Sequence, residues 1–583
     1  MKIFKYPCGD GTIMRHDTKS RRRVLREALA VGGAGVSVAL AGCGSDSDGS
    51  DGGGGSDGSD GSDGGSAGAG DPVEPIEFIV TTQSYDPVRY EFGNLIAENW
   101  RELGFEVEVN PLAWNTIVSR TFDEQNFDAF TLNWAGRAER LDPDPFCYSL
   151  HHSSQTESGG NNMVNYENSE YDEYAEEQRR TYDEDERKDA VLRCQEIFAE
   201  DQPRTPIANQ TQNMPYLEDS FDEIVDMIGE GLMSFWTAVD SVPADGVDQI
   251  SLGYPSDVNN LNPVDGTATH DTQTMRLIYD KLVRIDTDGT VTNWLAEDVE
   301  AVDDTTVRAT IRTDQQWHDG EDLTVEDVKF SFDYLQEYSA VLSGFMGPLE
   351  STSIVDDQTV EFSMSEAFAP FISTALGQVF IIPQHIWETI PEDLDGISEP
   401  VGWENPEPVG SGPFEFVSWS RDEQMILQAN EDHFNPPNIP ELIKIPGADI
   451  QSLVRLLEDG SLDMIGWVPG PDTVNRLRNQ VDRAAVNSID SHGWYHINYQ
   501  LDRAPFDDIA VRHALADAIP KQDIVDIVMD GQGTVTHTFM AEVNEFWHNP
   551  DVRQFGDNLE RAQTTLEEAG YTLQDGRLHY PEE

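Results

Sequence analysis

The chain has 583 residues, 38% of them hydrophobic, so it is long enough for several domains of ~100–150 residues. It carries 109 acidic residues against 37 Lys and Arg, a formal net charge of -72. Such a surface repels phosphate groups. This excludes a nucleic-acid-binding protein and disfavours adhesion to anionic lipid headgroups.

Two causes of such acidity compete, disorder and adaptation to high salt. Disorder fits poorly, because the chain has 12 Trp, 25 Phe and 17 Tyr and its apolar residues are periodic over most of its length. In salt of 1 M and above the Debye length is ~3 Å or less, so carboxylates keep a protein soluble with little self-repulsion. We interpret the composition as that of an extreme halophile's protein. After residue 43 the only lysines are Lys188, Lys281, Lys329, Lys444 and Lys521.

The amino-terminal segment has the order of an export signal. Residues 20–26, Ser-Arg-Arg-Arg-Val-Leu-Arg, place twin arginines before a mild apolar stretch at 28–42, which is similar to a Tat signal. The stretch is too short and too rich in Gly and Ala to span a bilayer. It ends in Leu-Ala-Gly-Cys at 40–43, which resembles a lipobox and implies cleavage before a lipidated Cys43. We expect export by a Tat-like route and a lipid anchor on the outer face of the cytoplasmic membrane.

A linker follows the lipobox. Residues 44–71 are almost purely Gly, Ser and Asp, a composition typical of flexible coil with an r.m.s. reach of ~30 Å. In an exported protein, Cys147 and Cys194 are candidates for a disulfide, but the sequence does not show whether their Cα atoms lie within bonding range.

The first folded region alternates strands and helices. Apolar residues recur at helical spacing over 86–103, where Gly104 ends the helix, and 127–134 reads as a strand. Strand, helix, strand, helix, strand predicts an α/β layered domain. The expected elements are strands 76–82, 105–109 and 127–134, and helices 86–103, 114–122, 168–182 and 184–200.

The rest of the chain mixes short strands with helices. A strand is expected at 306–312 and a helix start at 324–328, and Asp575-Gly576 predicts a tight turn. No repeat of 20–50 residues and no further membrane span is evident. The remaining elements are helices 505–518, 522–529 and 559–569 and a strand at 496–499.

Six segments resemble the peptide/nickel (family 5) class of extracellular solute-binding proteins of ABC importers. The most specific is 316–328, Gln-Trp-His-Asp-Gly-Glu-Asp-Leu-Thr-Val-Glu-Asp-Val, whose own pattern predicts a turn before the helix. One departure is Pro520-Lys521, where that family usually has Asp-Arg. The other segments are 260–263, 278–282, 294–297, 410–414 and 505–515.

The segments stand in an unusual order. In the family, a segment like 75–215 follows one like 483–580, whereas here it comes first. Joining residue 583 to residue 75 restores the family's order, and 235–250 then connects what are normally the two termini. We interpret this as a circular permutation, which is physically reasonable because domain termini lie at the surface and often close together.

The resemblance implies a fold and a division of the chain. The fold class is α/β, with two lobes of the type II periplasmic-binding-protein kind, an extra domain in one lobe and ligand held between the lobes. The expected parts are a signal at 1–43, a linker at 44–74, a ligand-binding lobe at 75–215 and 483–583, the crossing and start of the other lobe at 216–265, its extra domain at 266–405 and its remainder at 406–482.

Candidate ligand contacts lie where the cleft is expected. The strand at 127–134 ends in Asn-Trp-Ala-Gly-Arg, and ligands of α/β folds sit beyond the carboxyl ends of strands. Peptide-binding relatives carry Trp-x-x-Asp here, and the aspartate holds the peptide ammonium; in this chain Arg137 follows Trp134. Asp142 is an alternative acid, although a cap or turn before Pro143 explains it equally well. Trp467, Trp494 and Tyr495 are further candidates, since aromatic faces suit a peptide side chain or a sugar.

No motif for catalysis, cofactor or metal binding stands out. The sequence has no Gly-x-Ser-x-Gly, P-loop, His-Glu-x-x-His or Cys-x-x-Cys pattern, and His151-His152 is better explained as a loop feature. We therefore expect a monomeric, non-enzymatic receptor that passes a solute to ABC permease and ATPase subunits. A peptide is the first choice of solute, an oligosaccharide or a chelated metal the alternative. A ligand-sensing role stays open. A membrane-tethered extracellular hydrolase is the alternative function from a different class of protein.

Overall fold

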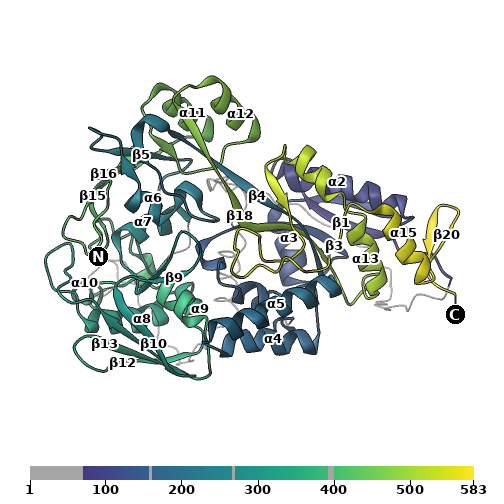
Figure 1. The fold of residues 1–583 in the computed structure, drawn as a ribbon, viewed down its shortest axis with the longest axis horizontal. Coiled ribbons are helices and arrows are strands. Elements are labelled where there is room, and N and C mark those ends of the chain that lie inside the picture. Colours follow the sequence, from purple (N-terminus) through teal and green to yellow (C-terminus); the bar gives the residue numbers. More distant parts are fainter. Residues whose placement is uncertain (1–69, 157–159, 266–268, 391–398, 583) are drawn as a thin grey trace, which may run out of the picture.

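The computed structural model describes residues 70–156, 160–265, 269–390 and 399–582. The expected signal, Cys43 and most of the linker fall outside these residues. Within them, no helix is both long and apolar enough to cross a bilayer. Figure 1 shows the molecule as an elongated body, with the end of the chain at one tip and the segment 269–390 at the other side.

One eleven-stranded sheet runs through both lobes. Its order is β14-β15-β16-β7-β17-β4-β18-β3-β1-β2, with β19 paired to β4. The strands are β1 (Ile76–Thr81), β2 (Val107–Leu112), β3 (Ala129–Trp134), β4 (Arg204–Leu217), β7 (Ile250–Tyr254), β14 (Phe414–Ser420), β15 (Gln424–Ala429), β16 (Glu441–Pro446), β17 (Met464–Ile465), β18 (Ala484–Tyr499) and β19 (Gly533–Val535).

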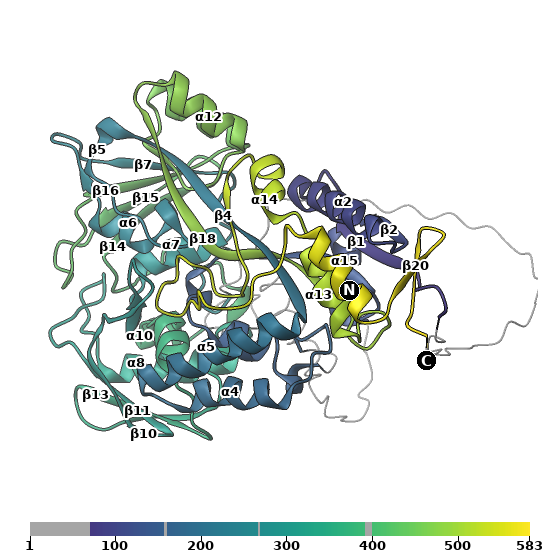
Figure 2. The ribbon, with the colours of Figure 1, turned by 45° about the vertical axis from the view of Figure 1, so that its right-hand side comes forward.

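The long strands β4 and β18 cross between the lobes, as Figure 2 shows. Their antiparallel pairing has two parts. Residues 484–490 pair with 211–217 on the side of β17, and 494–498 pair with 204–209 on the side of β3. The pairing register is broken between Asp490 and Trp494, so three residues at the crossing point stand outside the ladder.

The first lobe has three layers. Along β1, Phe78 packs on one face of the sheet with helices α2, α13 and α15, and its neighbour Ile79 packs on the other face with α4 and α5. This alternation explains the near-continuous apolar run of that strand, which is covered on both sides. The helices are α2 (Pro87–Glu102), α4 (Ser169–Arg180), α5 (Glu184–Asp201), α13 (Ile509–Asp517) and α15 (Leu559–Glu568).

The second lobe carries the extra domain at the lower left of Figure 1. The domain is built on the antiparallel sheet β10-β11-β13-β12 and helix α8 (Val325–Tyr338), which starts with a capping box of Thr324 and Asp327. The strands of this sheet are β10 (Ala296–Asp303), β11 (Thr306–Ile311), β12 (Leu349–Ile354) and β13 (Thr359–Met364). Further helices of the second lobe and its extra domain are α7 (Thr269–Ile278), α9 (Leu342–Phe345), α11 (Ile450–Asp459) and α12 (Pro471–Gln480).

Most expected elements are present, with corrected bounds. The helix expected at 505–518 begins at Ile509, because the Asp508 side chain accepts from the backbone N–H of Ala510 and caps it there. The helix expected at 114–122 is α-helical only as far as Val118 and continues as a π-helical turn. The strand expected at 496–499 is the end of the sixteen-residue β18.

The two ends of the described chain pair with each other. The backbone N–H of Gly70 donates to Pro581 O at 3.1 Å, and that of Tyr580 donates to Asp71 O at 2.9 Å. The pair continues into the hairpin of β20 (Thr572–Gln574) and β21 (Arg577–His579), whose turn residues Asp575 and Gly576 have φ of 52° and 83°. This confirms the expected tight turn.

The two cysteines of the folded part, Cys147 and Cys194, are free thiols. Both are buried in the core between the first-lobe sheet and α4 and α5. Burial, with Cys194 beside it, raises the pKa of the Cys147 thiol well above its ordinary value. A protonated thiol is a poor nucleophile, so these two buried thiols are unreactive.

Candidate functional site

A cavity of about 280 Å³ lies where the three parts of the molecule meet. Its first-lobe wall is the end of β3, residues 144–150 and the end of α4. The rest comes from α7 of the second lobe and from α9 with residues 368–380 of the extra domain. Helix α7 falls within the range expected for the extra domain but packs on β14 of the second lobe. The cavity is at the small end of the range for pockets that bind small molecules. A site bounded by both lobes is the site that lobe closure would enclose.

The first-lobe wall begins where β3 ends. Trp134 lines the cavity, and Arg140 donates to the backbone carbonyl of Ala135 at 2.6 Å while its guanidinium lies 5.1 Å from the Trp134 ring. The chain can turn here because Gly136 has no side chain: a Cβ would lie 2.3 Å from Ser491 Oγ. Arg137, the next residue, also lines the cavity.

Arg137 is fixed through its backbone to the crossing segment of β18. Nε2 of His492 lies 2.9 Å from the backbone N of Arg137 and 2.6 Å from its backbone O. His492 stands within the break in the β4–β18 ladder. The cavity wall and the crossing point are therefore in direct contact.

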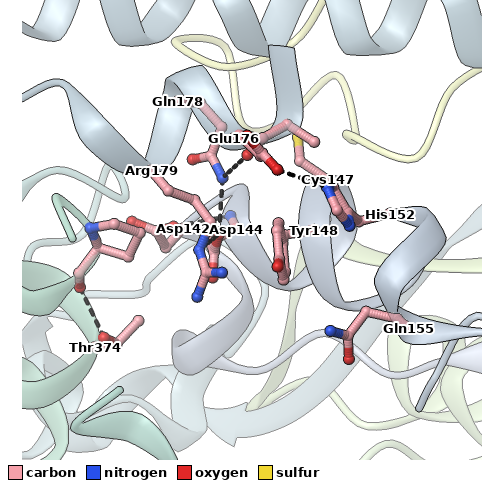
Figure 3. A network of polar contacts seen from close by, with 12 residues as sticks. Asp142, Asp144, Cys147, Tyr148, His152, Gln155, Glu176, Gln178, Arg179 and Thr374 are labelled. Atoms are coloured by element: carbon pink, nitrogen blue, oxygen red, sulfur yellow. Dashed lines mark hydrogen bonds and ion pairs between the residues drawn. The ribbon is translucent and has the colours of Figure 1, made fainter. Parts of the chain in front are cut away.

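Asp144 and Arg179 form an ion pair at the cavity wall, with Arg179 Nε 3.1 Å from Asp144 Oδ1. Figure 3 shows the arginine beside the Tyr148 ring, whose centroid is 3.8 Å from its guanidinium carbon. The amide of Gln178 also donates to Asp144, at 2.7 Å. Burial raises the pKa of the Asp144 carboxyl, an effect that the Arg179 charge opposes.

A second ion pair stands on the opposite wall. Arg276 of α7 donates to Glu230 Oε2 at 2.7 Å, and Glu230 Oε1 accepts from the backbone N–H of Ala138 at 3.3 Å. Glu230 thus connects a second-lobe helix to a first-lobe turn beside the cavity.

Four polar atoms of the wall are buried without a hydrogen-bond partner in the described part of the chain. They are the indole nitrogen Nε1 of Trp134, a residue only 4% exposed, Oε1 of Gln273, Nε of Arg276 and Nε of Arg179, the last of which lies in the ion pair with Asp144. Buried polar groups are normally satisfied, so these atoms mark places where a bound molecule would supply the partner.

The remaining wall is apolar. Phe345, Phe368 and Phe380 come from the extra domain, and Phe146 and Leu150 from the first lobe. Apolar side chains come from both the first lobe and the extra domain, and arginines from both lobes, so the cavity is amphipathic.

Asp142 lies elsewhere. It is buried, and Arg187 donates to both of its carboxylate oxygens, at 3.0 and 2.7 Å. Ser373 Oγ donates to it as well, at 2.5 Å, which ties the first lobe to the extra domain. These partners occupy the hydrogen-bonding positions of its carboxylate, and Asp142 does not line the cavity. Asp142 and Arg187 therefore form a structural ion pair.

The three aromatic candidates also lie outside the cavity. Trp494 is 1% exposed and stacks on His496 with ring centroids 4.0 Å apart. Tyr495 is buried against Phe92, with its hydroxyl accepting from Gln210 at 2.5 Å. Trp467 is half-buried beside His270 of α7, 5.5 Å between ring centroids.

Of the residues predicted from the sequence, Trp134 and Arg137 line the cavity, but its other charged members were not predicted. They are Arg140, Asp144, Arg179, Glu230 and Arg276, which are spread over the chain, and no local pattern links them. Asp144 was within reach of sequence reasoning, since it follows Asp142-Pro143 directly. The described residues hold no cluster of three or more His, Cys, Asp or Glu that would suit a metal ion.

The profile of the bacterial extracellular solute-binding proteins, family 5, matches residues 54–158 and 290–582. The matched segments make up more than half of the chain. This chain belongs to the family 5 extracellular solute-binding proteins. The expected two-lobed α/β fold is thereby confirmed, and its relatives are transport receptors and not enzymes.

Curated relatives of this family 5 protein match it in part. The oligopeptide-binding protein AppA of Bacillus subtilis is 28% identical over 349 residues, 57% of this chain and 61% of AppA. The dipeptide-binding protein of Escherichia coli is 26% identical over 57% of this chain and 65% of that protein. The chain thus spans less than two thirds of the length of these relatives.

Solved structures of the family resemble this one over a similar share. AppA of Bacillus subtilis with a nonapeptide aligns with a TM-score of 0.42 and 23% identity, covering 56% of this chain and 65% of AppA. NikZ of Campylobacter jejuni with Ni(L-His) aligns with a TM-score of 0.42 and 21% identity, covering 57% of this chain and 66% of NikZ.

Proposed function

We propose that this protein is the substrate-binding component of an ABC importer, which captures a peptide-class solute and delivers it to a permease. The observation that carries the proposal is the cavity between the two lobes and the extra domain, in a chain of family 5. Closure of the lobes on a solute would present a single shape to the permease, which couples binding to delivery.

Binding without reaction fits the charged groups of the cavity. A hydrolase with paired carboxylates needs an acid and a base that are available to a substrate and to water. Here Asp144 pairs with Arg179 and Glu230 with Arg276. We therefore favour a receptor over the hydrolase, and a peptide-class solute over an oligosaccharide or a metal chelate.

We further propose a location outside the cell on a lipid anchor. It is supported by the family, whose members are extracellular, and by the twin arginines, lipobox and Gly/Ser/Asp linker of the sequence. With a linker reach of ~30 Å, the folded part would remain close to the membrane face where its permease lies.

We also propose that the chain is a circular permutation of the family's order. The pairing of 70–73 with 578–581 supports it, because it places side by side the two segments that the usual order would connect. The relatives' alignments support it too. A permuted chain aligns collinearly only over its longer block, and AppA matches 57% of this chain.

The test of function is the solute itself. Protein purified from its own host in molar salt, examined by native mass spectrometry, should carry a small molecule that rebinds after removal and raises the thermal midpoint by mass action. Release of that molecule in a chemically altered form would favour the hydrolase. Protein that carries nothing and responds to no extract of the growth medium would contradict the receptor.

A further inference from the structure

The cavity wall reverses the charge balance of the chain. Over the whole sequence, acids outnumber Lys and Arg by 109 to 37. A site drawn at random from this composition would be acidic. Among the described residues of the wall, guanidinium groups instead outnumber carboxylates by two to one; they are Arg137, Arg140, Arg179 and Arg276 against Asp144 and Glu230.

Both carboxylates already face a guanidinium. Asp144 lies 3.1 Å from Arg179 Nε, and Glu230 lies 2.7 Å from Arg276 Nη1. A ligand ammonium would have to compete with these arginines for its partner. A ligand carboxylate meets planar guanidinium donors, which match its two oxygens and are more weakly hydrated than an ammonium.

The arginines stand on both sides of the cavity. Arg137 and Arg140 come from the turn after β3 in the first lobe, and Arg276 comes from α7 in the second lobe. An anion between them would be contacted by both lobes at once.

A donor without an acceptor stands beside these arginines. Trp134 lines the cavity, and its buried indole N–H has no acceptor among the described residues. An N–H group can only donate, so the missing partner is an acceptor atom, such as a carboxylate oxygen. This observation is independent of the charge count and points to the same chemistry.

The part of the wall that the extra domain supplies suits an uncharged, apolar group. Phe345, Phe368 and Phe380 present aromatic rings from the extra domain. A ligand that filled the cavity would place its charged end against the first-lobe turn and α7 and its apolar body against these rings.

We propose that the cavity selects a small amphipathic carboxylate, with the carboxylate between the arginines of the two lobes and an apolar body against the extra domain. The proposal rests on the proposed function and narrows it, from peptides in general to anionic solutes of about dipeptide size. A free amino group is a disadvantage in this site.

The experiment uses one dipeptide, leucyl-phenylalanine, in four forms measured by calorimetry on the full chain in molar KCl. The N-acetyl form carries only the carboxylate, the C-terminal amide only the ammonium, the unmodified dipeptide both charges, and the doubly blocked form none. We expect the N-acetyl form to bind tightest and the amide weakest. Contact charge pairs in a cavity persist in high salt because they are screened much less than exposed ones.

Variants of two arginines distinguish the effect of a charge in the cavity from the effect of the protein's overall charge. Arg137→Glu should weaken the N-acetyl form by ~30-fold or more, the loss typical of a buried charged hydrogen bond, and should make the amide the better ligand. The control is Arg180→Glu, at a position whose side chain is 62% exposed and pairs with Glu176 away from the cavity. Arg137→Gln removes the charge without reversing it. It takes the place of Arg137→Glu if that variant has a lower thermal midpoint than the wild type.

The outcomes separate this inference from the proposed function. Tightest binding by the amide, or an order of affinities that Arg137→Glu and Arg137→Gln leave unchanged, overturns the anion-selective cavity but leaves a peptide receptor intact. Binding by none of the four forms overturns the inference as well. The proposed function then still depends on the molecule that the host-purified protein carries.

Discussion

The backbone N–H of Val73 donates to the carbonyl oxygen of Leu578 at 2.9 Å, so residues near opposite ends of the chain are hydrogen-bonded neighbours. The isolated bridge between Pro72 and His579 continues this contact. Joining the two ends therefore requires little movement of either one.

A gene that begins near Gln249, ends near Val239 and joins 583 to 75 through a short linker should give a protein that folds and binds as the parent does. The new ends lie in 235–250, the segment that connects what are normally the two termini, and the junction lies where the old ends already meet. Thermal midpoints in molar salt and solute affinity are the measurements. As a control, the same design cut inside α2, between Leu95 and Ile96, should fail, because that helix packs in the core. Insoluble protein from several linker lengths would count against the permutation.

Asp142→Asn should destabilise the protein by ~3–5 kcal/mol, because it leaves Arg187 buried without its counter-charge. Urea denaturation in molar KCl measures the change. The matched control is Glu170→Gln, which removes one partner of the exposed Arg193 and should change stability by ~1 kcal/mol or less. Equal effects of the two changes would contradict a structural role for Asp142.

The fold should depend on salt. With a formal net charge of -72, unscreened carboxylates repel one another over ~30 Å at 0.01 M salt, compared with ~3 Å at 1 M. We expect the thermal midpoint to fall steeply as KCl is lowered and cooperative unfolding to disappear. A midpoint that is the same at both salt concentrations would refute the halophile interpretation.

Lys521→Met should flatten the dependence of stability on pH between about pH 7 and 9.5. Burial lowers the pKa of Lys521 to about 7, although Asp557 and Asp517 oppose it, whereas the unfolded lysine titrates near ~10.4. In that window the unfolded chain binds more protons, so the wild type gains ~1.4 kcal/mol per pH unit from this residue as pH rises. Lys329, partly exposed beside Asp333, provides the control Lys329→Met, which should keep the wild-type slope.

Cys43→Ser should release the protein from the membrane fraction or leave an unprocessed precursor, since lipidation and cleavage both depend on the thiol. Fractionation of cells that express the full chain, with mass spectrometry of the amino terminus, measures this. A fully processed variant that stays on the membrane would exclude the lipid anchor. Cys194→Ser, in the core, is the control that should leave localisation unchanged.

The sequence predicted those elements whose signals are local. Helix α2 has a capping Asp86 at its start and Gly104, with φ of 93°, just after its end, and both are visible in the residues themselves. The strand β4 was missed because its central residues, Asn209 to Asn213, are polar. They are held by pairing with β18, which is far away in the sequence.

The site was predictable only in part, for the same reason. Trp134 and Arg137 follow a recognisable strand, whereas Arg179 and Arg180 are adjacent and alike in sequence. Only the position of α4 in the fold decides that Arg179 faces the cavity and Arg180 the solvent. Asp142 was expected to contact the ligand, but in the fold it pairs with Arg187 of α5. No local pattern in the sequence reveals this neighbour.

The break in the β4–β18 ladder has a mechanical consequence. On either side of it, backbone pairing fixes each half of the two strands to its own lobe, so bending is cheapest at Ser491 to Gly493, where β18 has no ladder partner on β4. Rotation about one short axis is then the expected motion. His492 lies on that axis and holds the backbone of Arg137, so a ligand that displaces Arg137 acts on the hinge itself. Binding of a ligand in the cavity would then change the angle between the two lobes. The outer faces of both lobes would move with that angle, without any intervening chain of contacts.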